Sequence, residues 1–583
     1  MRQHNQHEQI VTFIYDQRPQ TKAHVDDARR IICNRLGIKQ PANRFLLEAY
    51  QNLVKKKSIE RDQLLEHFLK KAHIRNLSGI AVVTSLVKPY MCPGKCVYCP
   101  TEARMPKSYI ATEPAAARAL RLNFSPYEQM KRRIEMLEAN GHNCDKIEFI
   151  VKGGTWNAYP LTYQYWFILE SFKACNNMKR RMPITPTSEE DWKIKRLEDL
   201  MQAVEHEQKY NETARHRIIG LTLETRPDAI SPKTIWHMRE LGCTRVELGL
   251  QAPDDKILEL IKRGHTVEHF RDAILLLRTA GFKVDLHFMP QLPGTTPAHD
   301  VEMYKQIFDD PGLRPDMVKI YPCVVTKTAE LYQWFQEGTY TPYSNAELFD
   351  ALLQMKLATP RYCRISRLIR DIPETEIEAG NKVTNLREDL AKELARRGQT
   401  CVCLRCREIG RQRHSVIPAK AGIQKSRIPD QVGDDMKPLQ FVDQYDTIGG
   451  TEYFLSFEDE ERNVVYGFLR LRLQNGVANV SSPGQSELTF ATPQDKLNEC
   501  LPEIRDAAFI RELHVYGDLV PIGDRSKRAE QHKGLGKKLV VEAEKIAIQN
   551  GFTKVAVISG VGVRGYYRKL GYKKLGTYML KSL

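Results

Sequence analysis

Short apolar runs, separated by amphipathic stretches, fill the middle of the chain. The first of them, at 80–87, is rich in β-branched residues, and the others occur at 146–151, 218–223, 245–250, 284–289 and 317–321. Apolar runs of this length are typical of strands that are buried on both faces, and helical stretches such as 267–279 lie between them. The alternation predicts parallel βα units over residues 76–370. These would form a barrel or part-barrel with its ligand loops at the carboxyl ends of the strands.

The two ends of the chain follow different patterns. Residues 1–75 are predicted to form short helices, and residues 371–411 a linker. Residues 412–437 have no sustained apolar period and contain prolines and glycines, which is typical of a loop or a disordered insertion. Residues 438–583 are expected to form a smaller α/β domain, with strands at 453–457, 464–473, 510–516 and 554–559 and a helix at 537–550.

Composition indicates a globular protein, and the charge fits either a polyanionic partner or a merely basic soluble protein. A chain of 583 residues, 42% of them hydrophobic, is too long for one core and predicts two or three domains. The net charge is +16, and residues 1–75 hold 15 basic against 8 acidic residues. Basic residues such as Lys55, Lys56 and Lys57 can follow phosphates; a solvated helix face is the alternative. No segment has the apolar length of a membrane span, so a cytoplasmic location is expected.

The cysteines point to metal chemistry, because thirteen thiols in such a chain favour ligands and buried thiols over disulfides. Cys92, Cys96 and Cys99 follow the first predicted strand, and no other cysteine lies between Cys33 and Cys144. Three soft thiolates at this spacing can hold three corners of a [4Fe–4S] cluster and leave one iron open to a substrate or cofactor. The alternatives are a zinc knuckle without its fourth ligand and a chance cluster.

Glycines and polar residues follow three of the other predicted strands. Gly153 and Gly154 follow the second strand, Glu224 and Arg226 the third, and Gln251 the fourth. Because the carboxyl ends of parallel strands meet at one edge, we expect these residues to form a ligand site together with the cysteine loop.

A second cysteine group occurs at Cys401, Cys403 and Cys406. A tetrahedral zinc ion would need one more ligand. Cys323, at the end of a predicted strand, is the first candidate and His414 the second. Reduced thiols on a loop are the alternative.

A glycine-containing loop, 531–536, directly precedes the helix predicted at 537–550. Free backbone N–H groups and the positive end of the helix dipole make such a loop a site for a pyrophosphate. With the strand and the GVGVRGYYRKLGY stretch that follow, the arrangement resembles the GCN5-related acetyltransferases, which bind acetyl-CoA between two splayed central strands.

The spacing of Cys92, Cys96 and Cys99 resembles the signature of the radical S-adenosylmethionine (SAM) superfamily. The whole chain except 412–437 resembles the single-chain, bacterial form of the Elongator catalytic subunit, a family of tRNA-modifying radical-SAM acetyltransferases. The most specific stretches are DKIEFIVKGGTW, LTLETRPD, RGHT, RDIP, RELHVYG and AVISGVGVRGYYRKLGYKKLG. The resemblance implies an α/β fold in which a radical-SAM partial (β/α)6 barrel precedes a GCN5-related acetyltransferase domain, with a basic helical segment at the N-terminus.

This resemblance also implies a reaction. A [4Fe–4S] cluster and SAM would generate a deoxyadenosyl radical that takes a hydrogen atom from the methyl group of acetyl-CoA. The carbon radical would add to carbon 5 of the wobble uridine in a tRNA anticodon stem-loop, and hydrolysis of the thioester would leave a carboxymethyl group. The enzyme would act as a single chain or as a homodimer.

The family's functional residues map onto this sequence as follows. Its cluster ligands match Cys92, Cys96 and Cys99, although eukaryotic members space the first two more widely. SAM contacts are expected at Gly153, Gly154, Glu224 and Gln251. Acetyl-CoA contacts are expected at Lys146, Glu512, Leu513, His514, Val515, Leu535, Gly536, Lys537 and Tyr567, with Tyr567 and Lys146 as the candidate catalytic residues. Many members lack the second cysteine group.

Two other classes of function fit part of the pattern. A protein lysine acetyltransferase with a structural iron–sulfur domain would need no SAM-binding strand ends, and the net charge of +16 fits tRNA better than a basic protein substrate. A non-catalytic tRNA-binding module would have no reason to keep the cysteine triad and the glycine loop intact.

Overall fold

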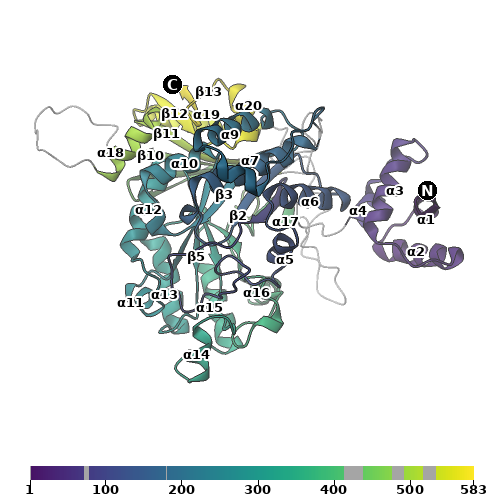
Figure 1. Cartoon of the computed structure of the whole chain (residues 1–583), viewed down its shortest axis with the longest axis horizontal. Coiled ribbons are helices and arrows are strands. Elements are labelled where there is room, and N and C mark those ends of the chain that lie inside the picture. Colours follow the sequence, from purple (N-terminus) through teal and green to yellow (C-terminus); the bar gives the residue numbers. More distant parts are fainter. Residues whose placement is uncertain (1, 71–77, 179, 413–437, 476–491, 517–533) are drawn as a thin grey trace, which may run out of the picture.

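The computed structural model describes residues 2–70, 78–178, 180–412, 438–475, 492–516 and 534–583 (Figure 1). Three bodies follow one another along the chain: a small group of helices, a large sheet with helices around it, and a second sheet at the C-terminus.

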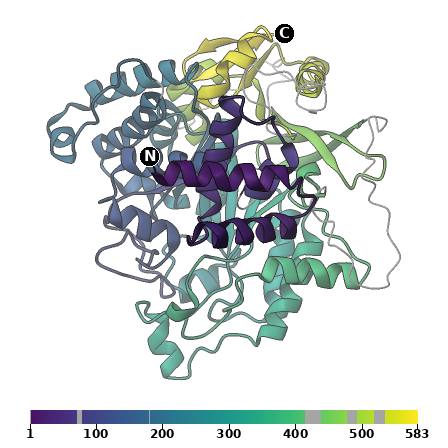
Figure 2. The ribbon, with the colours of Figure 1, turned by 90° about the vertical axis from the view of Figure 1, so that its right-hand side faces the viewer.

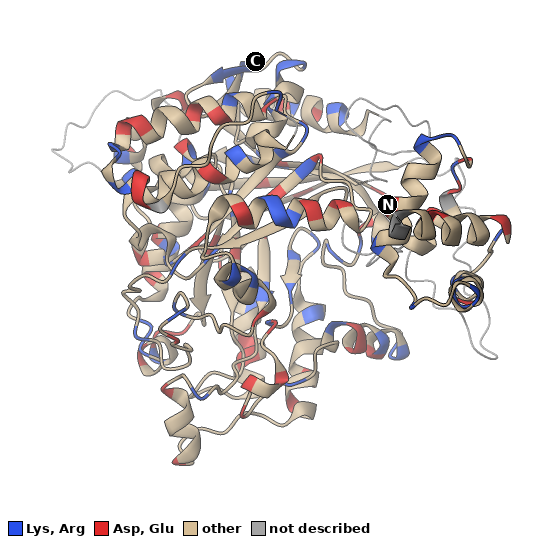
Figure 3. Cartoon of the chain, turned by 45° about the vertical axis from the view of Figure 1, so that its right-hand side comes forward, with Lys and Arg blue, Asp and Glu red and all other residues tan. Residues whose placement is uncertain are grey.

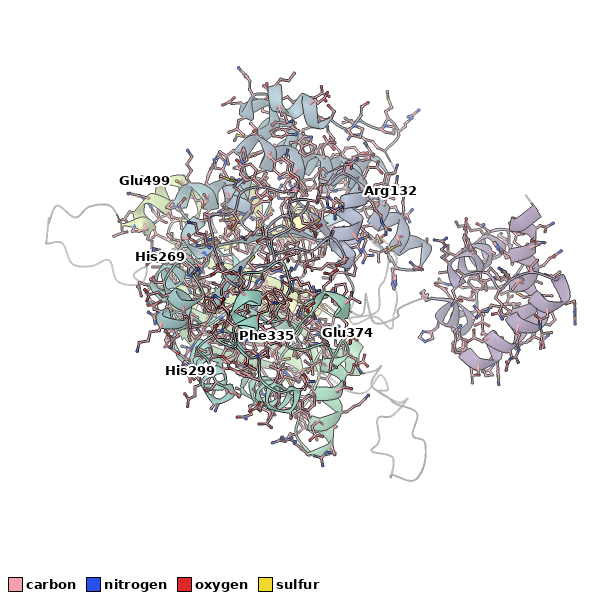
Figure 4. All side chains as sticks on the ribbon, turned by 60° about the horizontal axis from the view of Figure 1, so that its bottom comes forward. Arg132, His269, His299, Phe335, Glu374 and Glu499 are labelled. Atoms are coloured by element: carbon pink, nitrogen blue, oxygen red, sulfur yellow. The ribbon has the colours of Figure 1, made fainter. Side chains whose placement is uncertain are left out.

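The N-terminal helices α1 (Arg2–Asp16), α2 (Lys22–Leu36), α3 (Asn43–Lys55) and α4 (Gln63–Leu69) confirm the predicted helical segment. They share an apolar core that includes Ile10, Leu46 and Leu65. Their side chains form a body of their own in Figure 4, and Arg132 lies on the side of the barrel that faces this body. Lys55, Lys56 and Lys57 are exposed at the end of α3.

The central sheet is the parallel part-barrel that the sequence predicts. Its strands are β1 (Ala81–Leu86), β2 (Lys146–Lys152), β3 (Arg217–Thr225), β4 (Arg245–Gln251), β5 (Lys283–Phe288), β6 (Met317–Ile320) and β7 (Arg364–Arg367). They pair in chain order, so β1 and β7 form its two edges and leave a seam between them. The short β7 adds a seventh strand to the six expected. Its sequence RISR has no apolar run, because Arg364 and Ser366 point into the barrel lumen.

Helices cover the outside of the part-barrel (Figure 1 and Figure 2). They are α5 (Pro114–Arg121), α6 (Pro126–Ala139), α7 (Leu161–Asn177), α8 (Glu189–Ile194), α9 (Leu197–Asn211), α10 (Pro232–Glu240), α11 (Asp255–Leu260), α12 (Val267–Thr279), α13 (Pro297–Asp309), α14 (Leu331–Gln336), α15 (Asn345–Ala358) and α16 (Leu386–Arg396). The short helix α17 (Ile409–Gln412) follows, and its Ile409 packs in the core of the C-terminal domain. Side-chain caps fix where several begin: Ser231, Thr266 and Ser344 each accept the backbone N–H three residues on.

The C-terminal domain is a mixed sheet with the order β13-β14-β12-β11-β10-β9-β8. Its strands are β8 (Leu439–Thr447), β9 (Gly450–Glu458), β10 (Val465–Gln474), β11 (Ala508–Val515), β12 (Lys554–Val557), β13 (Lys573–Leu575) and β14 (Tyr578–Ser582), with helices α18 (Pro493–Cys500), α19 (Leu535–Gln549) and α20 (Arg564–Arg568). The parallel strands β11 and β12 pair only from Ala508 to Ile510. The rest of β11 runs on without β12, so the two strands splay apart as expected for an acetyl-CoA site.

A buried ionic network joins this sheet to the amino ends of the barrel strands. Arg511 of β11 donates to Asp316, just before β6, at 2.5 and 2.9 Å, and to Glu452 of β9 at 2.9 Å. Arg278 of α12 also donates to Glu452, at 2.7 Å. None of these four side chains is exposed. The C-terminal domain is therefore fixed against the end of the barrel that lies opposite the ligand loops.

Candidate functional site

The three clustered cysteines line one cavity of about 720 Å³ at the carboxyl ends of the barrel strands. They lie on the loop between β1 and α5. The Gly94 amide donates to Cys92 Sγ at 3.4 Å, and the Arg263 guanidinium donates to Cys96 Sγ at 3.4 Å. The Cys99 amide bonds the Cys96 carbonyl at 3.1 Å, which makes this part of the loop a tight turn. The loop thus presents three sulfur atoms to one space.

The electrostatics of this loop favour a thiolate at Cys96. Burial raises the pKa of this thiol, but the charge and the hydrogen bond of Arg263, helped by Arg226, outweigh burial and lower it below the ordinary value. Burial, followed by the neighbouring charge of Cys96, raises the pKa of Cys99 to about 12, so a bound cation is what would hold Cys99 as a thiolate. Three soft donors in a cavity lined by arginines fit an anionic iron–sulfur cluster.

The strand-end residues predicted from the sequence come together in the same cavity. Gly154, Glu224 and Gln251 line it, and Glu224 Oε2 accepts a hydrogen bond from the Tyr109 hydroxyl at 2.9 Å. Gly153 lies beside it with φ +140°, and a Cβ there would be 2.1 Å from a methyl group of Val87, so only glycine fits.

Sequence reasoning missed several residues of this cavity, including Tyr109, Arg263, His287, Met289, Tyr321 and Arg370. The strand-end rule that found Glu224 would also have found Met289 and Tyr321, which directly follow β5 and β6. Tyr109 and Arg370 come from loops, for which no periodic pattern gives a signal.

The second cysteine group has the geometry of a single-ion site. The sulfur atoms of Cys401, Cys403 and Cys406 all lie within 4.8 Å of one another, and zinc–sulfur bonds of about 2.3 Å would place tetrahedral ligands about 3.8 Å apart. The Lys356 ammonium lies 3.9 Å from Cys406 Sγ. Hydrogen bonds from Cys401 and Cys406 lower the pKa of Cys403 well below its ordinary value.

The first candidate for the fourth zinc ligand, Cys323, is wrong. Cys323 does not belong to this sulfur group. Its loop continues β6 to the rim of the barrel, so its thiol lines the 720 Å³ cavity instead. Burial raises its pKa to about 12. The second candidate, His414, lies outside the described residues.

A second cavity, of about 350 Å³, lies where the C-terminal domain meets the barrel. Glu512, Leu513 and His514 of β11 line it together with Tyr567 of α20, so the structure brings these four predicted residues to one cavity. Val515, the last residue of β11, pairs with Gly467 of β10 and does not line the cavity. Barrel residues complete the wall, among them Ser78, Lys283 and Arg364. The site is therefore shared between the two domains.

Ion pairs set the charges in this cavity. Burial raises the pKa of Glu512, but Lys283 at 3.4 Å and Arg470 at 2.9 Å outweigh it and lower this pKa to about 2. Burial lowers the pKa of His514 to about 4, and a ring nitrogen of this residue lies 3.0 Å from the Ser78 carbonyl. Near neutral pH the cavity thus holds an ionised glutamate and a neutral histidine.

The expected pyrophosphate site is partly described. Leu535, Gly536 and Lys537 form the first turn of α19, after Gly534 in the left-handed conformation at φ +76°. A Cβ at Gly536 would lie 2.8 Å from the Tyr566 hydroxyl. Residues 531–533 of the loop lie outside the described residues.

Lys146 is not brought to the 350 Å³ cavity. It is the first residue of β2, where burial lowers its pKa, and it is not among the residues that line the cavity. Its family-based assignment as a catalytic acetyl-CoA contact thus has no support from the geometry.

No helix of the described ranges is long and apolar enough to cross a membrane.

Two protein-family models match the barrel, and curated relatives match most of the chain. The Radical SAM superfamily profile matches residues 87–307, and the Radical_SAM C-terminal domain matches residues 315–396. The tRNA uridine(34) acetyltransferase of Methanocaldococcus jannaschii is 39% identical over 94% of this chain and 92% of its own length. That of Dehalococcoides mccartyi is 38% identical over 87% of this chain and 99% of its own length.

The resemblance extends to eukaryotes and to a solved structure. Human Elongator complex protein 3 is 35% identical over 88% of this chain and 86% of its own length. The structure of archaeal Methanocaldococcus infernus Elp3 with an N-terminal deletion matches with a TM-score of 0.67 and 38% identity, over 87% of this chain and all of that chain. The identity and the coverage show that the chain belongs to the Elongator protein 3 family, the radical-SAM tRNA uridine(34) acetyltransferases.

Proposed function

We propose that this protein uses a radical-SAM site and acetyl-CoA to place a carboxymethyl group on carbon 5 of the wobble uridine of tRNA, in the cytoplasm. The observation that supports this most directly is that two cavities share one part-barrel. The three-cysteine cavity lies at one end of the part-barrel and the β11 cavity at the other.

Cys92, Cys96 and Cys99 would hold a [4Fe–4S] cluster, and Gly154, Glu224 and Gln251 would contact SAM in the same cavity. When bound, this pair of cofactors supplies the one-electron chemistry that an unactivated methyl group requires. The protein's own residues orient the reactants. Arg263 holds Cys96 through its hydrogen bond, and Tyr109 fixes one carboxylate oxygen of Glu224.

The acetyl-CoA site would form at the splay between β11 and β12. Glu512, Leu513 and His514 would line the path of the acyl arm, with Tyr567 reaching it from α20. Leu535, Gly536 and Lys537 would present the N-terminus of α19 to the pyrophosphate, because free N–H groups and the helix dipole attract anions there.

A zinc ion held by Cys401, Cys403 and Cys406 would be structural. The loop that carries Cys401, Cys403 and Cys406 follows α16. It is held to the turn before β7, because the Leu404 amide donates a hydrogen bond to the Cys363 carbonyl at 2.9 Å. Arg407, directly after the loop, donates to Glu458 of β9 at 2.7 Å. An ion in this loop would thus stiffen the connection between the barrel and the C-terminal sheet.

The N-terminal helices would guide tRNA. Basic and acidic residues are interspersed over much of the molecule (Figure 3), so an unbroken basic run has particular weight. Lys55, Lys56 and Lys57 form such a run and are exposed. The target base would be splayed out of the anticodon loop to enter the cysteine cavity, as single-stranded RNA bases commonly are in protein complexes.

The test is nucleoside mass spectrometry on tRNA incubated anaerobically with reduced protein, SAM and acetyl-CoA. We expect 5-carboxymethyluridine with the wild type, none with Cys96→Ala, and normal yield with the control Cys175→Ala, whose buried thiol lies in the outer layer on α7. Absence of the product from wild-type reactions that consume SAM would overturn the proposal. Acetylation of lysine peptides without SAM would favour the protein acetyltransferase instead.

A further inference from the structure

The lumen of the part-barrel is charged, whereas a closed (β/α)8 barrel is filled with branched apolar side chains. Glu247, Asp285 and Lys319 project into it from β4, β5 and β6, and all three are buried. The Lys319 ammonium contacts Glu247 Oε2, and the Lys152 ammonium lies 3.8 Å from the same oxygen. Burying charges in a small barrel is unfavourable unless they are paired or serve a ligand.

The two cavities are the ends of this one lumen. Along each strand, alternate residues face the same side, and the lining passes from one cavity to the other in that order. On β4, Arg245 and Glu247 line the β11 cavity of about 350 Å³, whereas Gly249 and Gln251 line the cysteine cavity of about 720 Å³. On β5 and its end, Lys283 and Asp285 are followed in the same way by His287 and Met289.

The cavities meet at three residues that line both of them: Thr84, Lys152 and Arg367. These lie on β1, β2 and β7. Since β1 and β7 are the unpaired edges of the sheet, the connection follows the open seam of the part-barrel.

Polar atoms in the lumen lack partners. Oε1 of Glu247, Oδ1 of Asp285 and Oε1 of Gln251 are buried and accept no hydrogen bond in the described structure. Such acceptors call for an occupant with N–H donors. The lysine ammonium groups of the same wall would in turn donate to carbonyl oxygens. An occupant with both amides and carbonyls satisfies both halves of the wall.

We propose that the lumen is a threading site for the acyl-pantetheine arm of acetyl-CoA, which would carry the acetyl methyl group from the β11 cavity to the floor of the cysteine cavity. The arm contains two amide groups and ends in the thioester carbonyl. Its backbone has the length of about four extended amino-acid residues, roughly 13–14 Å. The wall of β2 from Glu148 to Lys152 spans about 13 Å by the strand rise of 3.3 Å per residue. This inference rests on the proposed function, because it assigns the route by which the two sites share one substrate.

The first experiment plugs the lumen with Thr84→Trp and uses Thr84→Val as the matched control. With methyl-deuterated acetyl-CoA, we expect the plugged variant to transfer at least 100-fold less deuterium into 5′-deoxyadenosine for each SAM cleaved in the same reaction, so that any change in SAM cleavage itself is divided out. Without any cluster, its affinity for acetyl-CoA should fall about tenfold, and its affinity for 3′-phospho-ADP, which lacks the arm, should not change. Wild-type deuterium transfer in Thr84→Trp would overturn the inference.

The second experiment needs only a small substitution. In Thr84→Cys protein without cluster, peptide mass mapping gives the rate at which N-ethylmaleimide alkylates position 84. Acetyl-CoA should slow that rate at least tenfold, and 3′-phospho-ADP should leave it unchanged. An equal rate with and without acetyl-CoA would overturn the threading site. The proposed function fails separately, if wild-type protein cleaves SAM but transfers no deuterium and makes no modified uridine.

Discussion

Asp316→Asn is expected to destabilise the interface between the barrel and the C-terminal domain more than any substitution on the surface. The carboxylate is fully buried and faces Arg511, with Arg470 at 3.7 Å and Arg278 at 3.9 Å. Asparagine keeps the shape, and its one oxygen can still accept from the Val284 amide, now 2.9 Å from Oδ2. Its amide nitrogen, however, would face the Arg511 nitrogen that now donates to Oδ1 at 2.5 Å.

The size of the effect follows from these contacts. One hydrogen bond to a charged group is lost, worth about 1.5–3 kcal/mol, and a buried guanidinium loses half of its counter-charge. Removing one partner of a buried ion pair typically costs about 3–5 kcal/mol, and we expect that range here. The control Asp350→Asn breaks a pair with Arg397 at 3.6 Å whose side chains are 53% and 42% exposed, so its cost should stay within about 1 kcal/mol.

The assay is urea denaturation of the full chain, followed through the transition of the barrel and C-terminal domain. The midpoint should fall with little change in slope. Burial raises the pKa of Asp316, but Arg511, then Arg278 and Arg470, outweigh burial and hold it far below the ordinary value. This stabilisation is present above the unfolded pKa of about 3.9 and is lost as the pH falls below it, so wild type and variant should converge in acid. A variant within about 1 kcal/mol of wild type at pH 7 would refute the reasoning.

Three further predictions follow from the same structure. Changing Lys55, Lys56 and Lys57 to Gln should weaken tRNA binding and reduce the slope of log affinity against log salt by up to about 2–3, as expected for three phosphate contacts; an unchanged slope would place the tRNA path elsewhere. Tyr567→Phe should lower acetyl-CoA-dependent modification at least tenfold while SAM cleavage without tRNA stays normal, and wild-type turnover would remove Tyr567 from the site. Cys403→Ser should abolish zinc binding in elemental analysis without lowering the iron content of reconstituted protein, and fully loaded wild-type protein without zinc would contradict the metal assignment.

Hydrophobic periodicity predicted the barrel, because most of its strands are apolar on the outer face and are long enough for the pattern to be recognised in the sequence. It could not reveal β7, whose lumen-facing Arg364 and Ser366 remove the apolar run. The strand-end rule placed Glu224 and Gln251 correctly, since the carboxyl edge of a parallel sheet gathers such residues by geometry alone. Spacing could not place Cys323, because which loops meet depends on packing between distant segments. For the same reason, no local sequence pattern indicated that Asp316 and Arg511, 195 residues apart, form a buried ion pair.

The two edge strands of the C-terminal sheet differ in how readily a further strand could pair with them. At one edge β13 is three residues long and carries Lys573 and Lys574, so it is short and repels a further strand. At the other edge β8 is nine residues long and pairs with β9 along its whole length, with Leu439 and Val442 each 46% exposed. A peptide or another subunit that added a strand to this sheet would therefore pair with β8. Such a strand would have to accommodate the charges of Asp443, which is held by Arg462, and of Asp446.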